Sequence, residues 1–494
     1  MKEHHSIFNH ALAPITPGPS SSNTCGPVRI GLICNALLGA VPTEVNVAYS
    51  KDGAFPTTLY GMKSDVAFIN GLLGREQNVS DFNDAYKIAK ESEMNVSFSE
   101  VDDLTIGGME TVRVTMKDKN GYCLTVIAES IGGGAFKTHY IDDCSINIMG
   151  MNYELLVFVE KNTDVNELAD KLAGHIEKLN EYCCVEGKDY SIINIKSAAP
   201  FSEKLLTDIE LIDSVLNPIH PIVNDVSKTA PFETPKEMME YCKENNCSVA
   251  QAAVRYEMAI SGWTEREVRN YGQMLIDIMK DSRRNGFNSS LKFEGIVSPK
   301  ASVLQNKMGQ GNLPSLGLLN TAVPAALGIM EHSNATGKIV CVPTGGSSGI
   351  VPGLLLAAAD YMKASEDELY EAVMTAGIIG VLMMVDGNEF SGGTHGCQAE
   401  VACGTAMAAA GMVKMIGGTA KQACDAASMS LQCLLGLICD PVAGLVQVPC
   451  LARNMAGVSI AATAAECVCS GFDVVIPLDE MTPIMVRVGA EISD

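Results

Sequence analysis

Apolar residues recur with two different periods along this chain, and the period changes once. Alternating apolar and polar residues at 111–116, which read TVRVTM, predict a β-strand in the first part of the chain. From Pro235 onwards the spacing becomes i, i+3, i+4, as in PKEMMEYCKENNCSVAQAAVRYEMAISG, and this spacing is typical of amphipathic helices. The pattern therefore predicts an α+β N-terminal domain over residues 1–151 and an all-α domain over residues 235–494.

A shorter pattern lies between these two parts. The segments ELLVFVE (154–160), DVNELADKLAGHIEKLN (164–180) and YSIINIK (190–196) predict a strand, a helix and a second strand. This βαβ unit, at residues 152–199, resembles the small ACT-type regulatory module, and a structural role and an effector-binding role fit it equally well. Prolines punctuate residues 200–234, which we expect to form a linker.

Composition narrows the class of protein. A chain of 494 residues predicts two or three domains, and a formal net charge of −23 argues against nucleic acid or an anionic membrane as a partner. The N-terminus is polar, so we expect no signal peptide. Apolar runs such as 354–359 and 372–385 are shorter than the roughly 20 residues of a membrane span. We therefore expect a cytoplasmic protein, whose 17 cysteines are thiols rather than disulfides.

Three small polar loops interrupt the apolar helices of the second half. They read PTGGSSGIVPG (343–353), SGGTHGCQAEVACGTAMAAAG (391–411) and LLGLICDPVAGLVQVPC (434–450). Glycine permits positive φ and lets backbone approach a ligand closely, so loops of this composition inside a helical core predict a buried site. The candidate ligands in these loops are Cys397, Cys403 and Cys439.

In order and spacing, these loops and the ARN that follows them resemble the catalytic chain of the iron–sulfur L-serine dehydratases over residues 230–494. The resemblance implies an all-helical catalytic domain that converts L-serine to pyruvate and ammonia by α,β-elimination. It also implies a [4Fe–4S] cluster with one open iron, which acts as a Lewis acid on the β-hydroxyl because hydroxide leaves poorly at neutral pH.

The resemblance extends to the N-terminal domain through three motifs. They read ITPGPSSSNTCGPVRIG (15–31), LYGMKSDVAFINGLLG (59–74) and LTVIAESIGGGAF (124–136). The first offers hydroxyls and backbone N–H groups at a helix N-terminus, which suit a carboxylate or an ordinary N-cap. The family has histidine where this chain has Asn23 and again in the region of Met62 and Lys63, so the histidine thought to take the α-proton is absent.

We derive the predicted site from these motifs. The predicted catalytic residues are Ser348, Asp440 and Lys63. The residues predicted to bind the substrate are Ser20, Ser21, Ser22, Asn23, Thr24, Ser130, Gly132, Gly133, Thr344, Gly345, Gly346, Ser347, Gln398, Arg453 and Asn454.

Whether this chain can bind the cluster depends on the residues at the three ligand positions. Aligned by motif, the family's three cysteine positions fall on Ser348, Cys397 and Thr405, and hydroxyls are poor ligands for iron–sulfur clusters. The sequence therefore predicts a chain without the cluster, which holds no cofactor or binds a single metal ion at His395, Cys397 and Cys403. An alternative leaves the cluster in place with Cys403, Cys439 or Cys450 as substitute ligands. Of these, Cys403 lies two residues from Thr405, an offset of about 200° on a helix, and should point away from the site.

Three functions remain open on this basis. The first is serine dehydratase-type elimination from a small amino acid, the second is a non-catalytic small-molecule sensor, and the third is a cluster-free paralogue acting on another amino-acid-like substrate. The family and the many apolar helices also predict a homodimer.

Overall fold

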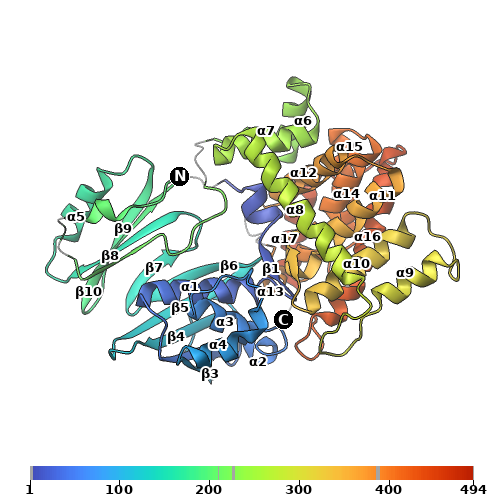
Figure 1. The fold of residues 1–494 in the computed structure, drawn as a ribbon. Coiled ribbons are helices and arrows are strands. Elements are labelled where there is room, and N and C mark those ends of the chain that lie inside the picture. The colour runs from blue at the N-terminus through green and yellow to red at the C-terminus, as the bar shows by residue number, and fades with distance from the viewer. Residues whose placement is uncertain (1–3, 208, 210, 225–228, 385–389, 493–494) are drawn as a thin grey trace. The chain divides into compact units, whose positions relative to one another are not determined.

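The computed structural model describes residues 4–207, 209, 211–224, 229–384 and 390–492 (Figure 1). The chain divides into two compact units. One contains Ser22–Val226, and the other joins His4–Ser21 to Ser227–Asp494. The mixed N-terminal part and the helical C-terminal part that the sequence predicts are both confirmed. Part of the expected linker at 200–234 lies outside the described residues.

The N-terminal unit is built around a sheet in the order β3-β2-β4-β5-β6-β7, in which only the β2–β3 pair is parallel. Its strands are β2 (Glu44–Ser50), β3 (Asn95–Val101), β4 (Thr111–Lys117), β5 (Cys123–Gly132), β6 (Ala135–Ile141) and β7 (Cys144–Ile148). The helices beside the sheet in Figure 1 are α1 (Cys25–Leu38), α2 (Phe55–Thr58), α3 (Ser64–Leu72) and α4 (Ala85–Glu91).

Alternation along the strands creates the core of this unit. Every second residue of β5 is buried, and Val114, Val126 and Phe136 belong to one apolar cluster with residues of α1 and α3. Helices α1 and α3 approach closely because Gly31 and Gly71 face each other, so a Cβ at Gly31 would lie 2.8 Å from the Cα of Gly71.

A second sheet in the same unit has the antiparallel order β11-β8-β10-β9. Its elements are β8 (Tyr153–Glu160), α5 (Val165–Ala173), β9 (Leu179–Glu186), β10 (Tyr190–Ser197) and β11 (Asp213–Leu216). The expected strand, helix and strand are present as β8, α5 and β10, and Val157, Ile193 and Ala169 pack together between sheet and helix. The structure adds β9 and β11, while the ACT-like role stays a prediction.

The second unit is a helical bundle around α14, which packs against α11, α12, α15 and α16 (Figure 1). Its helices are α6 (Pro235–Glu244), α7 (Val249–Ser261), α8 (Glu265–Gly286), α9 (Ala301–Gly309), α10 (Leu319–Asn334), α11 (Ile350–Met362), α12 (Glu366–Leu382), α13 (Gly392–His395), α14 (Cys403–Ile416), α15 (Ala420–Gln432), α16 (Gln447–Cys469) and α17 (Leu478–Glu491). The segment Gln398–Ile416 is long and apolar enough to cross a membrane, but 78% of its apolar window is buried within the protein, as expected of a core helix.

The first residues of the chain are packed into this helical unit. Strand β1 (Ile15–Pro17) pairs with β12 (Lys338–Val340), and a π-helical turn, η1 (Ile7–Ala11), lies against α12. Glu257 of α7 anchors the segment, because its carboxylate accepts hydrogen bonds from Ser6 Oγ at 2.5 Å and from the Ile7 backbone at 2.8 Å. Residues 4–21 are therefore a built-in part of the helical unit.

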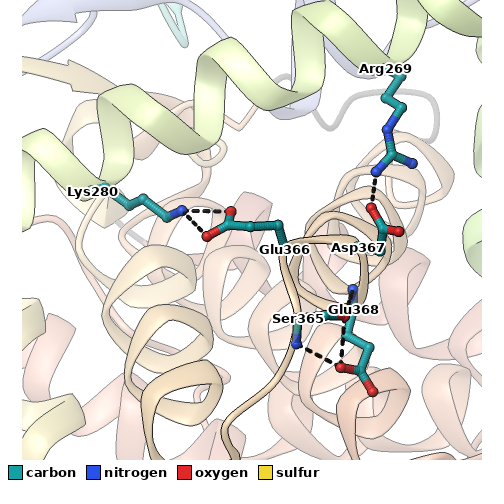
Figure 2. A network of polar contacts seen from close by, with 6 residues as sticks. All are labelled: Arg269, Lys280, Ser365, Glu366, Asp367 and Glu368. Atoms are coloured by element: carbon teal, nitrogen blue, oxygen red, sulfur yellow. Dashed lines mark hydrogen bonds and ion pairs between the residues drawn. The ribbon is translucent and has the colours of Figure 1, made fainter.

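Ion pairs attach α8 to the N-terminus of α12 at the surface (Figure 2). Lys280 Nζ lies 2.6 Å from Glu366 Oε2, and Arg269 pairs with Asp367. Ser365 caps α12 in a capping box with Glu368. Each exposed pair contributes about 0–1 kcal/mol, so these contacts orient the helices more than they stabilise them.

The buried Glu257 carboxyl predicts an unusual pH dependence of stability. Burial raises its pKa to about 7, so the folded state keeps a proton that the unfolded state releases above about pH 4.5. Stability therefore falls as pH rises from about 4.5 to 7, by on the order of 3 kcal/mol for this group. We expect the fall in Tm between about pH 5 and pH 8 to be smaller in Glu257→Gln. The exposed Glu294→Gln is the control, and equal falls in both variants and the parent would contradict the assignment.

Candidate active site

The three glycine-rich loops meet at the start of α16. Asn454, which is fully buried, accepts a hydrogen bond from the Gly349 backbone at 3.0 Å and donates to the carbonyls of Gly346 at 2.7 Å and Cys450 at 2.8 Å. One amide side chain thus ties the first loop to the third. Both the oxygen and the nitrogen of this amide are hydrogen-bonded to backbone groups, so Asn454 holds the loops together in this structure.

Gln398 makes the corresponding link between the second and third loops. Its Nε2 donates to the Met485 carbonyl of α17 at 2.8 Å, its Oε1 accepts from the Gly436 backbone at 2.9 Å, and its own backbone N–H donates to Leu437. Gly396 fits here because its φ is +71° and a Cβ would lie 2.6 Å from the Leu437 carbonyl oxygen. Hydrogen bonds thus join the third loop to both the first and the second in this unit.

Three cysteines meet where these loops converge. Cys397 directly precedes a π-helical turn, η5 (Gln398–Ala402), Cys439 lies in the third loop, and Cys450 lies in the first turns of α16. The Cys397 thiol hydrogen-bonds with the thiols of both Cys439 and Cys450. Cys397 and Cys450 are buried whereas Cys439 is exposed, so the triad is open on one side.

Arg453 lies one helical turn after Cys450 and faces the triad. Its Nη1 is 2.6 Å from Asp440 Oδ1 and donates to the Ile438 carbonyl at 3.0 Å, while the guanidinium also hydrogen-bonds with Cys397. Asp440, one of the predicted catalytic residues, therefore holds Arg453 against the cysteines. Arg453 supplies the positive charge beside a potential thiolate.

These contacts shift the pKa values of the three thiols in different directions. Hydrogen bonds from Cys439 and Cys450, with help from the Arg453 charge, hold the pKa of the Cys397 thiol well below its usual value. The hydrogen bonds to Cys397, together with burial and the Glu400 carboxylate, raise the pKa of the Cys439 and Cys450 thiols. Cys397 is thus the first of the three to become a thiolate, which is the form that binds metals.

Glu400 is a candidate that the sequence reasoning missed. It is half-buried on η5, and a Cβ at Gly346 would lie 3.4 Å from its Oε1, while a Cβ at Gly392 would collide with its Oε2. Its charge acts on both Cys439 and Cys450. π-helical turns inside α-helices often occur at functional sites, and the position three residues after Cys397 in GCQAEV was the available signal.

The hydroxyls of Ser348 and Thr405, the residues that align with two ligand positions, are hydrogen-bonded to backbone carbonyls. Ser348 Oγ donates to the Gly345 carbonyl at 2.9 Å, and Thr405 Oγ1 donates to the Val401 carbonyl of its own helix at 2.6 Å. Both hydroxyls serve backbone groups, and the side chains that gather with Cys397 are Cys439 and Cys450. The motif alignment could not show this gathering, because Cys439 and Cys450 lie 42 and 53 residues after Cys397.

The expected set of His395, Cys397 and Cys403 is not gathered as a metal site. The Cys403 sulfur lies 3.8 Å from that of Met485, toward α17. Across the part of the chain that the structure describes, no three His, Cys, Asp or Glu side chains are arranged to hold one metal ion. A cluster of several irons spaces its cysteine ligands further apart than a single ion does, so this result concerns sites for a single ion.

The N-terminal segment brings Ser21 to the first loop within the helical unit. The buried Ser21 Oγ accepts a hydrogen bond from the Gly345 backbone at 3.2 Å. Thr344 and Ser347 close the same turn through their own hydroxyls and backbone. A Cβ at Gly345 would lie 2.7 Å from the Ser21 backbone nitrogen and 3.2 Å from Ser20, so the two segments touch through glycine.

This close approach predicts a large effect of Gly345→Ala. The added methyl must push Ser20 and Ser21 away from the loop, and we expect activity to fall about a hundredfold with a small change in Tm, because small displacements of positioning groups are costly to catalysis. Gly309→Ala is the matched control, since a Cβ there meets nothing within 4 Å. Equal activities of the two variants in a steady-state assay would contradict the role of this contact.

A second polar cluster forms within the N-terminal unit around Glu110, which the sequence analysis did not select. Ser22 Oγ and Asn23 Nδ2 donate to Glu110 Oε1 at 3.2 and 3.0 Å, and Ser130 Oγ donates to the Ser22 carbonyl at 2.8 Å. Burial raises the pKa of Glu110 to about 7, partly offset by these hydrogen bonds. Ser22, Asn23 and Ser130 are thus brought together, with a carboxyl that titrates near neutral pH.

The remaining N-terminal candidates have mainly backbone roles. Gly132 and Gly133 adopt φ of 100° and 58° in the β5–β6 turn, and Thr24 is buried at the start of α1. Lys63 precedes α3 with φ of 63°, and its neighbour Ser64 donates to Asn23 Oδ1 at 3.0 Å. Lys63 itself influences Asp65, whose pKa is raised by burial. Binding of a substrate by these residues stays a prediction.

Comparison with known proteins shows what this chain is similar to. The family model described as serine dehydratase alpha chain matches residues 244–494. The L-serine dehydratase of Helicobacter pylori is 26% identical over 495 residues, covering 98% of this chain and 95% of that protein. The probable L-serine dehydratase alpha chain of Bacillus subtilis is 34% identical over 258 residues, 52% of this chain and 86% of that protein. The alpha chain of Peptoniphilus asaccharolyticus is also 34% identical, over 259 residues.

The fold and site define a helical unit that presents three thiols on glycine-rich loops. With these relatives, the chain belongs to the serine dehydratase family, a family of lyases. The resemblance inferred from the sequence is confirmed, and the match over nearly the whole Helicobacter pylori protein fits the single-chain form.

Proposed function

We propose that this protein is a lyase that removes the β-hydroxyl and the α-proton of L-serine, with pyruvate and ammonia as the final products. The observation that carries the proposal is the meeting of Cys397, Cys439 and Cys450 beside Arg453. The relatives named L-serine dehydratase support L-serine, a small amino acid, as the substrate.

The donor set fits the [4Fe–4S] cluster of the family. Three thiols from the second and third loops are the soft, ionisable ligands that such clusters need, and Cys397 has a lowered pKa. Held by these three, the cluster supplies an open iron that acts as a Lewis acid on the β-hydroxyl. The cluster-free and sensor hypotheses rested on Ser348 and Thr405 as ligand positions, so the triad favours the enzyme.

The chain's own groups account for substrate binding and charge. Arg453 stabilises the Cys397 thiolate and is itself fixed by Asp440. Glu400 offers a carboxylate to the substrate ammonium, and the Gly345–Ser347 turn of the first loop lies beside it. Asn454 and Gln398 fix the positions of these groups, because their side chains are hydrogen-bonded to the backbone of the loops.

The test is a substrate panel on protein purified without oxygen. We expect pyruvate from L-serine and none from D-serine, because a site that binds ammonium and hydroxyl on fixed loops discriminates between the two enantiomers. From L-threonine, which would give 2-oxobutanoate, we expect little product. Cluster-loaded protein that forms no pyruvate from L-serine would overturn the proposal. A cytoplasmic homodimer also stays a prediction, and light scattering at micromolar concentration tests the dimer.

A further inference from the structure

Helix α6 ends in a turn that places two cysteines together, far along the chain from the triad. The backbone N–H of Cys247 donates to the Cys242 carbonyl at 3.0 Å, the N–H of Asn246 donates to Lys243, and Asn246 has a φ of 47°. This is a Schellman motif, in which residues C3 and C″ come into side-chain contact. Here both of those positions are cysteines.

The two thiols meet as the backbone geometry requires. The Cys242 thiol is hydrogen-bonded with that of Cys247. Cys242 is buried, with 6% of its surface exposed, whereas Cys247 is half-buried and lines a cavity of about 220 Å³. Other residues around this cavity include Ser248, Thr375, Lys414 and Thr419. Cys247 is therefore the more accessible of the two cysteines, and Cys242 is buried next to it.

We propose that Cys242 and Cys247 form a reversible oxidation site that closes to a disulfide in the presence of a peroxide. In the first step the Cys247 sulfur attacks hydrogen peroxide, the O–O bond breaks, and Cys247 becomes a sulfenic acid with release of water. In the second step the Cys242 sulfur attacks the Cys247 sulfur, the S–O bond breaks, and a second water leaves. The two sulfurs together lose two electrons, and the two peroxide oxygens gain them.

The environment assigns the roles of the two thiols. Burial, with the neighbouring Cys247 thiol, raises the pKa of Cys242 to about 12, so Cys242 is a poor first nucleophile. Cys247 is the thiol that small molecules reach. The disulfide would join residues whose backbones are already hydrogen-bonded, so it requires little movement of α6 or α7. This inference is independent of the proposed lyase activity.

Another cysteine pair in the same unit is the matched control. Cys467 and Cys469 on α16 are both half-buried, but two residues along a helix turn a side chain through about 200°, so their sulfurs diverge. Exposure alone would make these two react like Cys247, whereas a disulfide requires the geometry of the Schellman turn.

The experiment titrates the anaerobic holoprotein with hydrogen peroxide, alkylates the remaining thiols and maps tryptic peptides. Lys243 lies between the two cysteines, so trypsin separates them and a disulfide links the peptides 237–243 and 244–255. We expect this linked pair to form at a peroxide concentration at least about tenfold lower than any oxidation of Cys467 or Cys469, and to disappear on reduction with a thiol.

Two variants keep the result interpretable. Cys242→Ser should leave a Cys247 sulfenic acid that a dimedone probe traps, and Cys247→Ser, at the more exposed position, should abolish the linked peptides without loss of the fold. The proposal would be overturned if Cys242 and Cys247 stayed reduced, and so open to alkylation, up to the peroxide concentration that oxidises Cys467. Linkage of Cys247 to another cysteine would also overturn it. Pyruvate formation is measured in parallel and its outcome does not bear on the disulfide.

Discussion

Replacing any one of Cys397, Cys439 and Cys450 by serine is expected to remove the cluster and to lower pyruvate formation more than about a hundredfold, since even outer-shell partners of metal ligands cost 10–100-fold. The triad has three thiols, so each replacement leaves only two soft donors. Cys397→Ser also removes the thiol that ionises first.

The control for these variants is Cys433→Ser. Cys433 is exposed at the end of α15, close in sequence to Cys439 but outside the triad. We expect parental iron content and parental activity from it. Iron content unchanged in Cys450→Ser, measured on protein whose circular dichroism matches the parent, would contradict the triad as the ligand set.

The second large effect is expected from Asn454→Leu. Leucine has a similar volume but leaves the Gly349 N–H and the Gly346 carbonyl buried without their partner, at about 1–3 kcal/mol for each group. We therefore expect the helical unit to lose about 2–5 kcal/mol of stability, measured by urea denaturation. Activity should fall with it, because the loop that carries Gly345–Ser347 is released from Cys450.

An exposed asparagine provides the comparison. Asn245 donates to the Tyr241 carbonyl at 2.9 Å at the surface, and Asn245→Ala should change stability by less than about 0.5 kcal/mol. If Asn454→Leu retained both parental stability and parental activity, Asn454 would not be the brace between the first and third loops.

The period of apolar residues predicted which part of the chain is mixed α+β and which is helical. This was possible because the period of a strand or helix is set by local backbone geometry alone. The alternation at 111–116 is strand β4, and the helical spacing from Pro235 is α6 and α7. Strands β9 and β11 were not predicted, since β9 is largely exposed and β11 has only four residues. Such strands are defined by their partners in the sheet rather than by their own pattern.

The candidate site was predictable as three loops but not as a set of ligands. Glycine and cysteine composition marked the loops, and their meeting is seen around Asn454 and Gln398. The gathering of the three cysteines could not be read from motif order, because Cys397 and Cys450 are 53 residues apart in sequence, with α14 and α15 between them. Glu400 was missed for a similar reason, since its neighbour Gly346 belongs to the first loop.

The placement of residues 4–21 likewise depends on long-range contacts. Glu257 and β12 hold this segment in the helical unit, and neither leaves a local signal at the N-terminus. Ser21 therefore reaches Gly345 across 324 positions of sequence.

The most direct test of the account is the iron and acid-labile sulfide content of protein purified without oxygen, measured together with its absorbance and its activity on L-serine. The cysteine triad predicts about four irons and four sulfides per chain, a brown colour and pyruvate formation that oxygen destroys. Protein that stays colourless and free of iron after anaerobic reconstitution, while forming pyruvate from L-serine, would show that the triad does not hold a cluster and would contradict the account.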